Sequence, residues 1–331
     1  LSQLRRHLAT ARRRGFENVR LLVLSVLPPE FTLPDTVRRI AWSDLYIWLR
    51  SQARSSAWAA RTAQYMEVLE GKMIADGYLK EGTLTVFSGI PFTKDNPYTY
   101  REAKRVLGLA MAELRKRRNL RGILRIDTEA AGKKAITGRK LTYVWDYIRL
   151  RGASTDADVW KVPHLTLSIQ HDHALAMVTL PNGLRASHRK RLVGAGQKPF
   201  GELFAKVTRQ LDGVGKRAPG SHPWVQMLQR RYPRSRSIPH SDARLEFDPR
   251  TCVSTGTPRP KGWPKYQPEW LDAVFSVFSA PRRKRSNMQL GLGVKFAYQD
   301  CPTVHRPKAI DAFASAWIAC KPLLDVVLGS P

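Results

Sequence analysis

The sequence predicts a mixed fold between the α/β and α+β classes, and three observations lead to it. In several segments apolar residues recur at steps of three and four, as in amphipathic helices. Residues 164–180 and 288–298 instead alternate apolar and polar residues, as half-buried strands do. The chain of 331 residues exceeds the length of a common single domain. We therefore expect an α/β region over residues 1–80, then an α+β region with antiparallel hairpins and a C-terminal helix over residues 81–331.

The chain begins with a basic helical segment that leads into a strand. Residues 2–14 are expected to form the helix, and Gly15 stands where helices usually end. Residues 19–27 are almost continuously apolar over about the length of one strand, and two prolines follow. Such a run is typical of a strand that is covered on both faces.

Two further helices are expected before residue 80. The first is short, "WSDLYIWLR" at 42–50, and either Ser43 or Asp44 would cap it. The second extends over about residues 58–73, and one side of it is expected to pack inward. That side consists of Trp58, Thr62, Tyr65, Leu69 and Met73.

The longer C-terminal region is expected to contain helices, a hairpin and long loops. Its clearest helix lies at about residues 100–118, and the segment at 164–180 is a good candidate for a hairpin. Residues 213–268 are rich in Pro, Gly, Arg and Ser, so they read as loops around a short strand. The other expected elements are a helix at 200–211, that short strand at 243–247, a strand at 288–298 and a final helix at 309–328 that Pro322 kinks.

Charge is the strongest indication of function in the sequence. Lys and Arg number 56 against 27 Asp and Glu, which gives a formal net charge of +29. Residues 1–150 hold 28 basic and 14 acidic residues, so the excess is not confined to a tail. A folded body this basic repels itself unless its partner is a polyanion, and nucleic acid is the common one. A membrane surface is the rival partner, but no basic amphipathic anchor beside a lipid signal is present.

The basic residues form clusters, and Arg dominates over Lys in them, which suits bidentate contacts with phosphate. Aromatic residues lie near several clusters, among them Trp224, Tyr232, Trp263 and Tyr266, and proteins that bind single strands combine cations with stacking rings. DNA is the expected partner and RNA the alternative, while the oligomeric state stays open. The residues expected to bind nucleic acid are Arg5, Arg6, Arg12, Arg13, Arg14, Arg115, Lys116, Arg117, Arg118, Arg189, Lys190, Arg191, Arg230, Arg231, Arg234, Arg236, Arg282, Arg283, Lys284 and Arg285.

Cysteine usage and hydropathy indicate a cytoplasmic protein. The three cysteines, Cys252, Cys301 and Cys320, are widely spaced and include no CxxC pair. They therefore predict neither a disulfide framework nor a zinc site, which fits a reducing compartment. No apolar run approaches the about 20 residues of a membrane span, and the first residues lack the regions of a signal peptide.

Candidates for catalysis are few. Glu70-Gly71-Lys72 has the acidic-x-Lys spacing of a nuclease motif, but it lies in a helical segment, whereas the motif requires a strand that puts both side chains on one face. We interpret it as a solvated helix end. His171 and His173 could bind a metal, although their place in a hairpin turn favours an ordinary turn.

The first 75 residues or so resemble the second half of a PD-(D/E)XK nuclease core. Gln3 and Leu4 match the Gln-Leu pair at the start of a core helix, residues 21–25 match a later strand, and residues 42–49 match the helix after it. The resemblance implies a Mg²⁺-dependent DNA endonuclease in which two carboxylates hold the metal and a Lys supports the developing charge. It gives Gln3 a supporting role.

The resemblance also has a serious gap. The carboxylates and the acidic-x-Lys strand of the family precede the position of Gln3. The resemblance therefore implies that the sequence given is a nuclease fragment without its catalytic strand, inactive as a hydrolase. Two interpretations stay open. The chain is part of an endonuclease, or it is a non-catalytic DNA- or RNA-binding protein, either a degenerate nuclease or an unrelated basic module.

Overall fold

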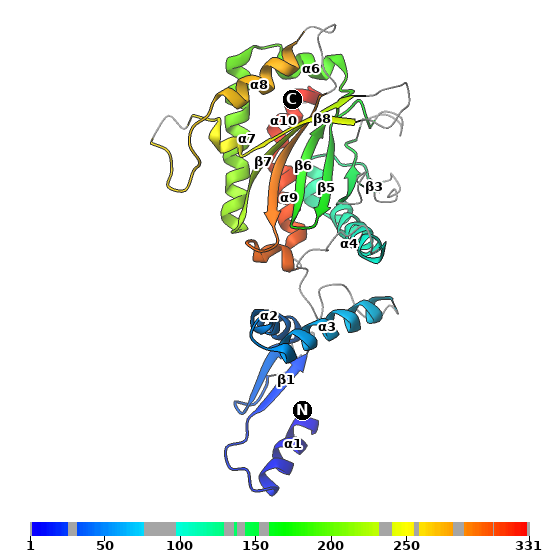
Figure 1. Ribbon diagram of the computed structural model, residues 1–331, viewed down its shortest axis with the longest axis vertical. Coiled ribbons are helices and arrows are strands. Elements are labelled where there is room, and N and C mark those ends of the chain that lie inside the picture. The colour runs from blue at the N-terminus through cyan, green and yellow to red at the C-terminus, as the bar shows by residue number, and fades with distance from the viewer. Residues whose placement is uncertain are drawn as a thin grey trace. The chain divides into compact units, whose positions relative to one another are not determined.

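The computed structural model describes residues 2–25, 32–75, 97–128, 136–137, 143–151, 159–231, 240–254, 258–280, 288–306 and 308–329. It confirms the mixed class of helices and strands (Figure 1). The chain divides into two compact units, Leu1–Phe87 and Ser88–Pro331, close to the expected boundary at residue 80.

The first unit contains a two-stranded parallel sheet with helices before and after it (Figure 1). The two strands pair in register from Leu21 opposite Val37 to Ser25 opposite Ala41. Gly15 follows the first helix with a φ of +83°, a conformation that suits glycine, so the expected helix end is confirmed. The elements are α1 (Ser2–Arg13), β1 (Leu21–Ser25), β2 (Val37–Ala41), α2 (Trp42–Gln52) and α3 (Ala57–Ala75).

The packing of the first unit differs from the expectation in three ways. Strand β1 is not covered on both faces, since Leu22 is 58% exposed. Helix α2 is capped by Ala41 without a side-chain hydrogen bond, and Asp44 lies inside the first turn. The expected inner side of α3 is largely exposed, with Trp58 at 78% and Tyr65 at 64%. Another side of α3, with Ala59, Ala63 and Met66, forms the core instead and packs against Tyr46 and Leu49 of α2.

The second unit is built on a seven-stranded antiparallel sheet with the strand order β3-β4-β5-β6-β9-β7-β8. The hairpin expected over 164–180 is confirmed as β5 and β6, which pair from His164 opposite Thr179 to Ile169 opposite Ala174. The strands are β3 (Ile136–Thr137), β4 (Tyr143–Ile148), β5 (His164–Gln170), β6 (His173–Leu180), β7 (Ser221–Arg231), β8 (His240–Phe247) and β9 (Met288–Ala297).

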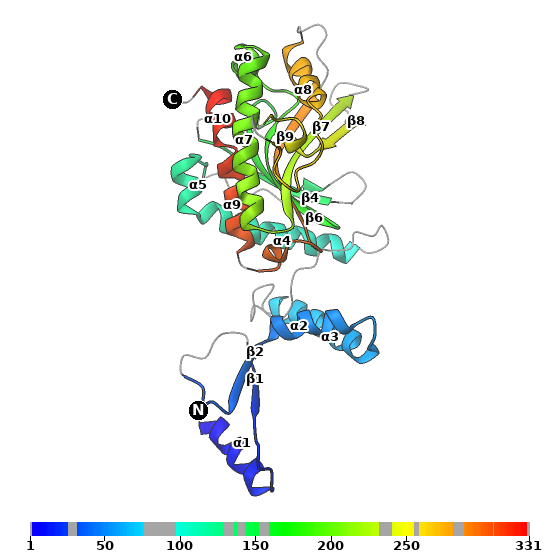
Figure 2. The ribbon, with the colours of Figure 1, turned by 90° about the vertical axis from the view of Figure 1, so that its left-hand side faces the viewer.

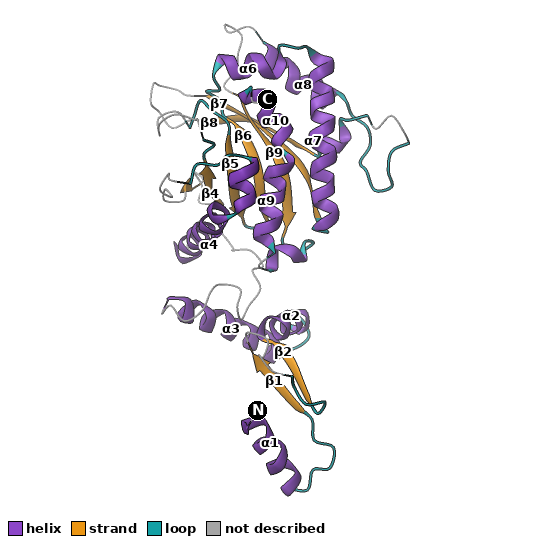
Figure 3. Ribbon diagram, turned by 180° about the vertical axis from the view of Figure 1, so that it is seen from behind, coloured by secondary structure: helices purple, strands orange, loops and turns teal. Residues whose placement is uncertain are grey.

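Helices cover one face of this sheet. Figures 2 and 3 show α7, α9 and α10 side by side on that face, and α4 packs along β4. The core between the layers is apolar, and Trp317 at its centre is fully buried and donates a hydrogen bond from Nε1 to the Thr166 carbonyl at 3.2 Å. The helices are α4 (Pro97–Lys116), α5 (Arg118–Ile123), α6 (Ala186–Val193), α7 (Gln197–Arg217), α8 (Glu269–Ser279), α9 (Ala309–Ala319) and α10 (Lys321–Leu328).

The region expected to be loops contains one of the central strands. Strand β7 runs for 11 residues and pairs with both β8 and β9. Its sequence "SHPWVQMLQRR" hides it, because Pro223 and the scattered polar residues weaken the alternation. The final helix was expected to be kinked at Pro322, and the structure instead divides it there into two helices: α9 ends at Ala319, and Pro322 lies in the first turn of α10.

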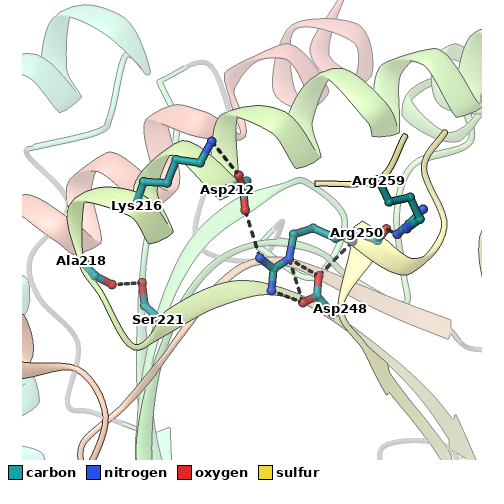
Figure 4. A network of polar contacts seen from close by, with 7 residues as sticks. All are labelled: Asp212, Lys216, Ala218, Ser221, Asp248, Arg250 and Arg259. Atoms are coloured by element: carbon teal, nitrogen blue, oxygen red, sulfur yellow. Dashed lines mark hydrogen bonds and ion pairs between the residues drawn. The ribbon is translucent and has the colours of Figure 1, made fainter. Parts of the chain in front are cut away.

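A buried network of charges joins the helix layer to the end of β8 (Figure 4). Arg250 contacts Asp248 with Nη2 at 2.7 Å and Asp212 of α7 with Nη1 at 3.1 Å. These carboxylates hold the pKa of Arg250 above its ordinary value, although burial alone would lower it. Arg259 also donates to the Arg250 carbonyl. These arginines are therefore engaged in contacts within the fold, and a high Arg content does not by itself provide a binding surface.

Candidate nucleic-acid interface

The second face of the antiparallel sheet carries no described helix, and we call it the helix-free face. Side chains that are paired across neighbouring strands share a face, so the register defines rows of neighbours. One row contains Trp145, Ser168, Leu175, Lys295 and His222. The next row contains Tyr147, Thr166, Met177, Gly293 and Trp224. Both rows thus place aromatic rings toward the two ends and smaller side chains between them.

One group of rings lies on the β4 side of this face. The ring centroid of Trp145 is 6.2 Å from that of Tyr147 and 6.4 Å from that of Trp160. Tyr147 in turn lies 5.4 Å from the ring of His164, which is buried. Trp160 is 47% exposed, so this group presents indole surface to solvent.

A second group lies on β7 and β9. The ammonium of Lys295 is 4.7 Å from the centroid of the Trp224 ring, a cation–π contact. His222 meets the same ring edge-on, with centroids 5.6 Å apart. Nε1 of Trp224 is buried and has no hydrogen-bond partner in the structure. The group therefore combines a stacking ring, a cation and an unsatisfied donor.

Two glycines of β9, Gly291 and Gly293, place no side chain on this face near Trp224. Gly293 is paired with Trp224, and a Cβ atom at this position would lie 2.1 Å from the Ala176 carbonyl oxygen. A Cβ at Gly291 would lie 2.6 Å from the sulfur of Met177. A larger residue at 293 would therefore clash with the backbone of β6, whereas one at 291 would require the flexible Met177 side chain to shift.

Among the described residues, Lys295 on this face forms no ion pair with a carboxylate. Arg244, by contrast, forms an ion pair with Glu246, which also accepts a hydrogen bond from Gln226 at 2.7 Å. Burial and the neighbouring charge of Lys295 hold the pKa of His173 below its ordinary value. The His173 ring is held by Asp172, whose Oδ1 lies 2.6 Å from Nδ1.

The basic clusters expected from the sequence are placed in different ways. Arg5, Arg6, Arg12, Arg13 and Arg14 of the first unit are exposed on α1 or just after it.

The cluster at the end of α4 is largely paired. Arg115 reaches the buried Asp146 at 3.4 Å, Arg117 pairs with Asp311 at 3.1 Å and Lys116 pairs with Glu113 at 2.8 Å. Arg118 is exposed. Arg115 and Arg117 therefore hold the second unit together, which reduces what this cluster offers to a ligand.

The cluster on α6 is divided in the same manner. Arg189 is only 4% exposed and its guanidinium lies 4.9 Å from the centroid of Phe278, so the expectation of a surface contact is wrong for it. Arg191 donates to the Leu328 carbonyl at 2.8 Å, at the end of α10, and Lys190 is exposed.

The remaining basic residues lie at the end of β7 or beyond the described part. Arg230 is half-buried near the end of β7, and Arg231 is its last residue. Five more arginines and one lysine fall outside the described residues: Arg234, Arg236, Arg282, Arg283, Lys284 and Arg285.

The catalytic candidates do not form a nuclease site. Glu70 and Lys72 both lie on α3, but Glu70 is 3% exposed whereas Lys72 is exposed, so the two side chains point to different sides. The expected solvated helix end is thus wrong for Glu70. Gln3 is exposed on α1. A Mg²⁺ site of the nuclease kind does not fit these residues.

His171 and His173 flank the turn of the β5–β6 hairpin, as expected. Both rings are near the same carboxylate, with Nδ1 of His171 at 3.5 Å and Nδ1 of His173 at 2.6 Å from Asp172 Oδ1. Within the described residues, no group of three or more His, Cys, Asp or Glu side chains is arranged to hold a metal ion. The turn interpretation accounts for these contacts.

Sequence reasoning found Trp224 but missed Trp145, Trp160 and Lys295. The available signal was the register of the strands, since the alternation of β9 places Lys295 opposite the apolar positions. Because β7 was not predicted from the sequence, the residues that lie beside Lys295 on the neighbouring strand could not be identified.

The described residues contain no helix with the length and apolarity needed to cross a membrane, and the three cysteines are buried and unbridged. No protein-family model matches the chain, and no curated protein matches it either.

Proposed function

We propose that the chain binds single-stranded nucleic acid and that the helix-free face of the second unit is its contact surface. The observation that carries the proposal is the meeting of Trp224 and Lys295 on neighbouring strands, with Trp145 and Trp160 on the same face. The net charge of +29 makes a polyanion the natural partner.

The chemistry of such binding requires rings and cations together. Unpaired bases stack on aromatic side chains, and each stacked base contributes about 1–3 kcal/mol. Phosphates between the bases need a cation, and Lys295 supplies one beside Trp224. The half-buried ring of His222 beside Trp224 offers a polar group to base edges. Duplex bases are stacked on each other and cannot use these rings, so a single strand is favoured.

DNA is expected before RNA, because the resemblance of the first unit is to DNA endonucleases. Stacking itself accepts both, since every base has a π-face. Binding without sequence preference follows from the same argument, as phosphate contacts position a strand without reading it.

The test is fluorescence anisotropy with a 20-nucleotide single strand of mixed sequence that carries a 5′-hydroxyl and a 3′ dye. Wild-type protein should bind it more tightly than the matching duplex, and the affinity should fall steeply between about 50 and 200 mM salt. Trp224→Ala should weaken binding about 10- to 100-fold, the loss of one stacked base.

The matched control is Trp58→Ala, because Trp58 is 78% exposed on α3 of the first unit and is not part of the helix-free face. It should bind as the wild type does. Equal affinity of wild type and Trp224→Ala, or an affinity indifferent to salt, would refute the proposed contact surface.

An endonuclease is the second candidate, favoured by the order of α1, β1 and α2 in the first unit, which is the order that the resemblance implies. Incubation of this chain with plasmid DNA and Mg²⁺ should give no cleavage, since Glu70 is buried on a helix. Cleavage that Glu70→Gln abolishes would instead establish this candidate.

A further inference from the structure

A separate cavity in the second unit gathers positive charge from segments that are far apart in the sequence. It has a volume of about 450 Å³ and is lined where the end of α5, the residues after β4, the start of α6 and α10 meet. Its charged lining consists of Arg125, Arg151, Arg185, Lys321 and Asp325, with His188 beside them.

The described lining carries more positive than negative charge. Asp325 is its acidic residue and is already paired with Lys321, whose Nζ lies 2.5 Å from Oδ2. The guanidinium groups of Arg125 and Arg151 form no ion pair among the described residues, and Arg185 lines the cavity beside them. Like charges gathered in this way repel one another, so a bound anion would stabilise the arrangement.

The backbone holds two of these arginines side by side. Ile126 and Leu150 form an isolated antiparallel bridge, and the N–H of Arg151 donates to the Arg125 carbonyl at 2.6 Å. Arg125 has a φ of +51°, a positive value that is rare for a residue other than glycine. Such a conformation costs about 1–3 kcal/mol and is typical of functional sites. Glycine would remove this strain.

His188 adds an unsatisfied polar atom. The residue is 7% exposed, and its Nδ1 is buried without a hydrogen-bond partner. Its ring also makes a hydrogen bond with the backbone carbonyl of Lys161. Burial, with Arg185 and Arg191 nearby, holds the pKa of His188 below its ordinary value. An anion in the cavity would provide both a partner for Nδ1 and a counter-charge for the arginines.

We propose that this cavity binds a phosphate monoester, either of a free mononucleotide or of the 5′-phosphorylated end of a strand. Planar guanidinium groups form bidentate hydrogen bonds with phosphate oxygens. Several of them together favour a phosphate dianion over a ligand with one singly charged carboxylate. The volume lies within the range of small-molecule sites. Among the described lining residues, His188 carries the one ring, so the phosphate is what the cavity recognises. The site is thus distinct from the stacking surface of the helix-free face.

The test uses isothermal titration calorimetry with adenosine 5′-monophosphate, inorganic phosphate and adenosine. The two phosphates should bind and adenosine should not. Arg151→Gln should weaken the binding of adenosine 5′-monophosphate at least 10-fold. Arg125→Gly should do the same while keeping or raising the melting temperature, because glycine accepts a φ of +51° without strain.

Arg209→Gln is the matched control, since Arg209 is exposed on α7 and does not line the cavity. It should bind adenosine 5′-monophosphate as the wild type does. If the nucleotide does not bind, or if Arg151→Gln and Arg125→Gly bind it as well as the wild type, the phosphate site is refuted.

Two oligonucleotides that differ only in a 5′-phosphate or a 5′-hydroxyl distinguish the two sources of the monoester. A preference for the 5′-phosphate that disappears in Arg151→Gln assigns the cavity to strand ends. Nucleotide binding without such a preference assigns it to free mononucleotides. Oligonucleotide binding that depends on Trp224 but not on Arg151 or Arg125, together with no binding of the nucleotide, would refute the cavity and leave the proposed function standing. Nucleotide binding without any oligonucleotide binding would refute the proposed function and leave the cavity.

Discussion

The two faces of the antiparallel sheet use the same strands for different purposes. On the helix-covered face, Asp146 is buried and reaches Arg115 at 3.4 Å, and Trp317 is buried with its Nε1 donating to a carbonyl. On the helix-free face, Trp224 lacks a partner for Nε1 and Lys295 lies over its ring. The covered face therefore contributes stability, whereas the helix-free face holds the half-buried rings of Trp145 and Trp224 toward its two sides, with buried residues such as Leu175 between them.

The largest expected effect concerns the covered face. Trp317→Ala would remove a fully buried indole and its hydrogen bond, which should lower the free energy of unfolding by about 3–5 kcal/mol. Urea denaturation followed by circular dichroism measures this loss. A loss below about 1 kcal/mol would mean that the helix layer does not hold the sheet as described.

The fold was largely predictable where a pattern repeats within one element. The alternation of residues 164–180 and the helical period near residues 100–118 both correspond to observed elements. Strand β7 was not predictable, because its neighbours β8 and β9, and not its own alternation, stabilise it. On α3 the period was recognised but the wrong side was chosen, since large rings at Trp58 and Tyr65 outweighed the small residues that actually pack.

The candidate sites were less predictable than the fold, for a physical reason. A run of arginines in the sequence does not show which of them are paired, and burial of Arg189 and pairing of Arg115 could not be read from spacing. The cavity arginines are scattered at positions 125, 151 and 185, and only the bridge between Ile126 and Leu150 brings the first two together. Sites assembled from distant segments leave no local pattern.

His164 tests whether the helix-free face is accessible throughout. By register it shares a row with Thr179, yet it is 2% exposed, and burial lowers its pKa to about 4. Between pH 6.5 and 4 the His164 ring should bind a proton in the unfolded chain but not in the folded chain. The free energy of unfolding should therefore fall as the pH falls. The full effect is about 3 kcal/mol near pH 4 and is absent above pH 7.

Urea denaturation at pH 7.5, 6 and 4.5 measures this dependence, and His164→Gln should make it shallower. His173, His188 and His222 also have lowered pKa values, so they add slope of the same sign. His171→Gln is the control, because His171 is exposed. A ring resonance of His164 that titrates near pH 6.5 would show that this end of the face is open to water.

Lys295 gives the smallest expected effect and the one most specific to the face. Lys295→Gln removes a cation that has a ring contact but no carboxylate partner among the described residues, so stability should change by less than about 0.5 kcal/mol. If the ammonium binds one phosphate of a single strand, the slope of log affinity against log salt should fall by about 0.7. The affinity itself should fall only a few-fold. Lys206→Gln on α7 removes an exposed charge from the other side of the sheet and should leave the slope unchanged. Equal slopes for the wild type and Lys295→Gln would mean that phosphates bind elsewhere, and the difference between the two faces would then be one of packing alone.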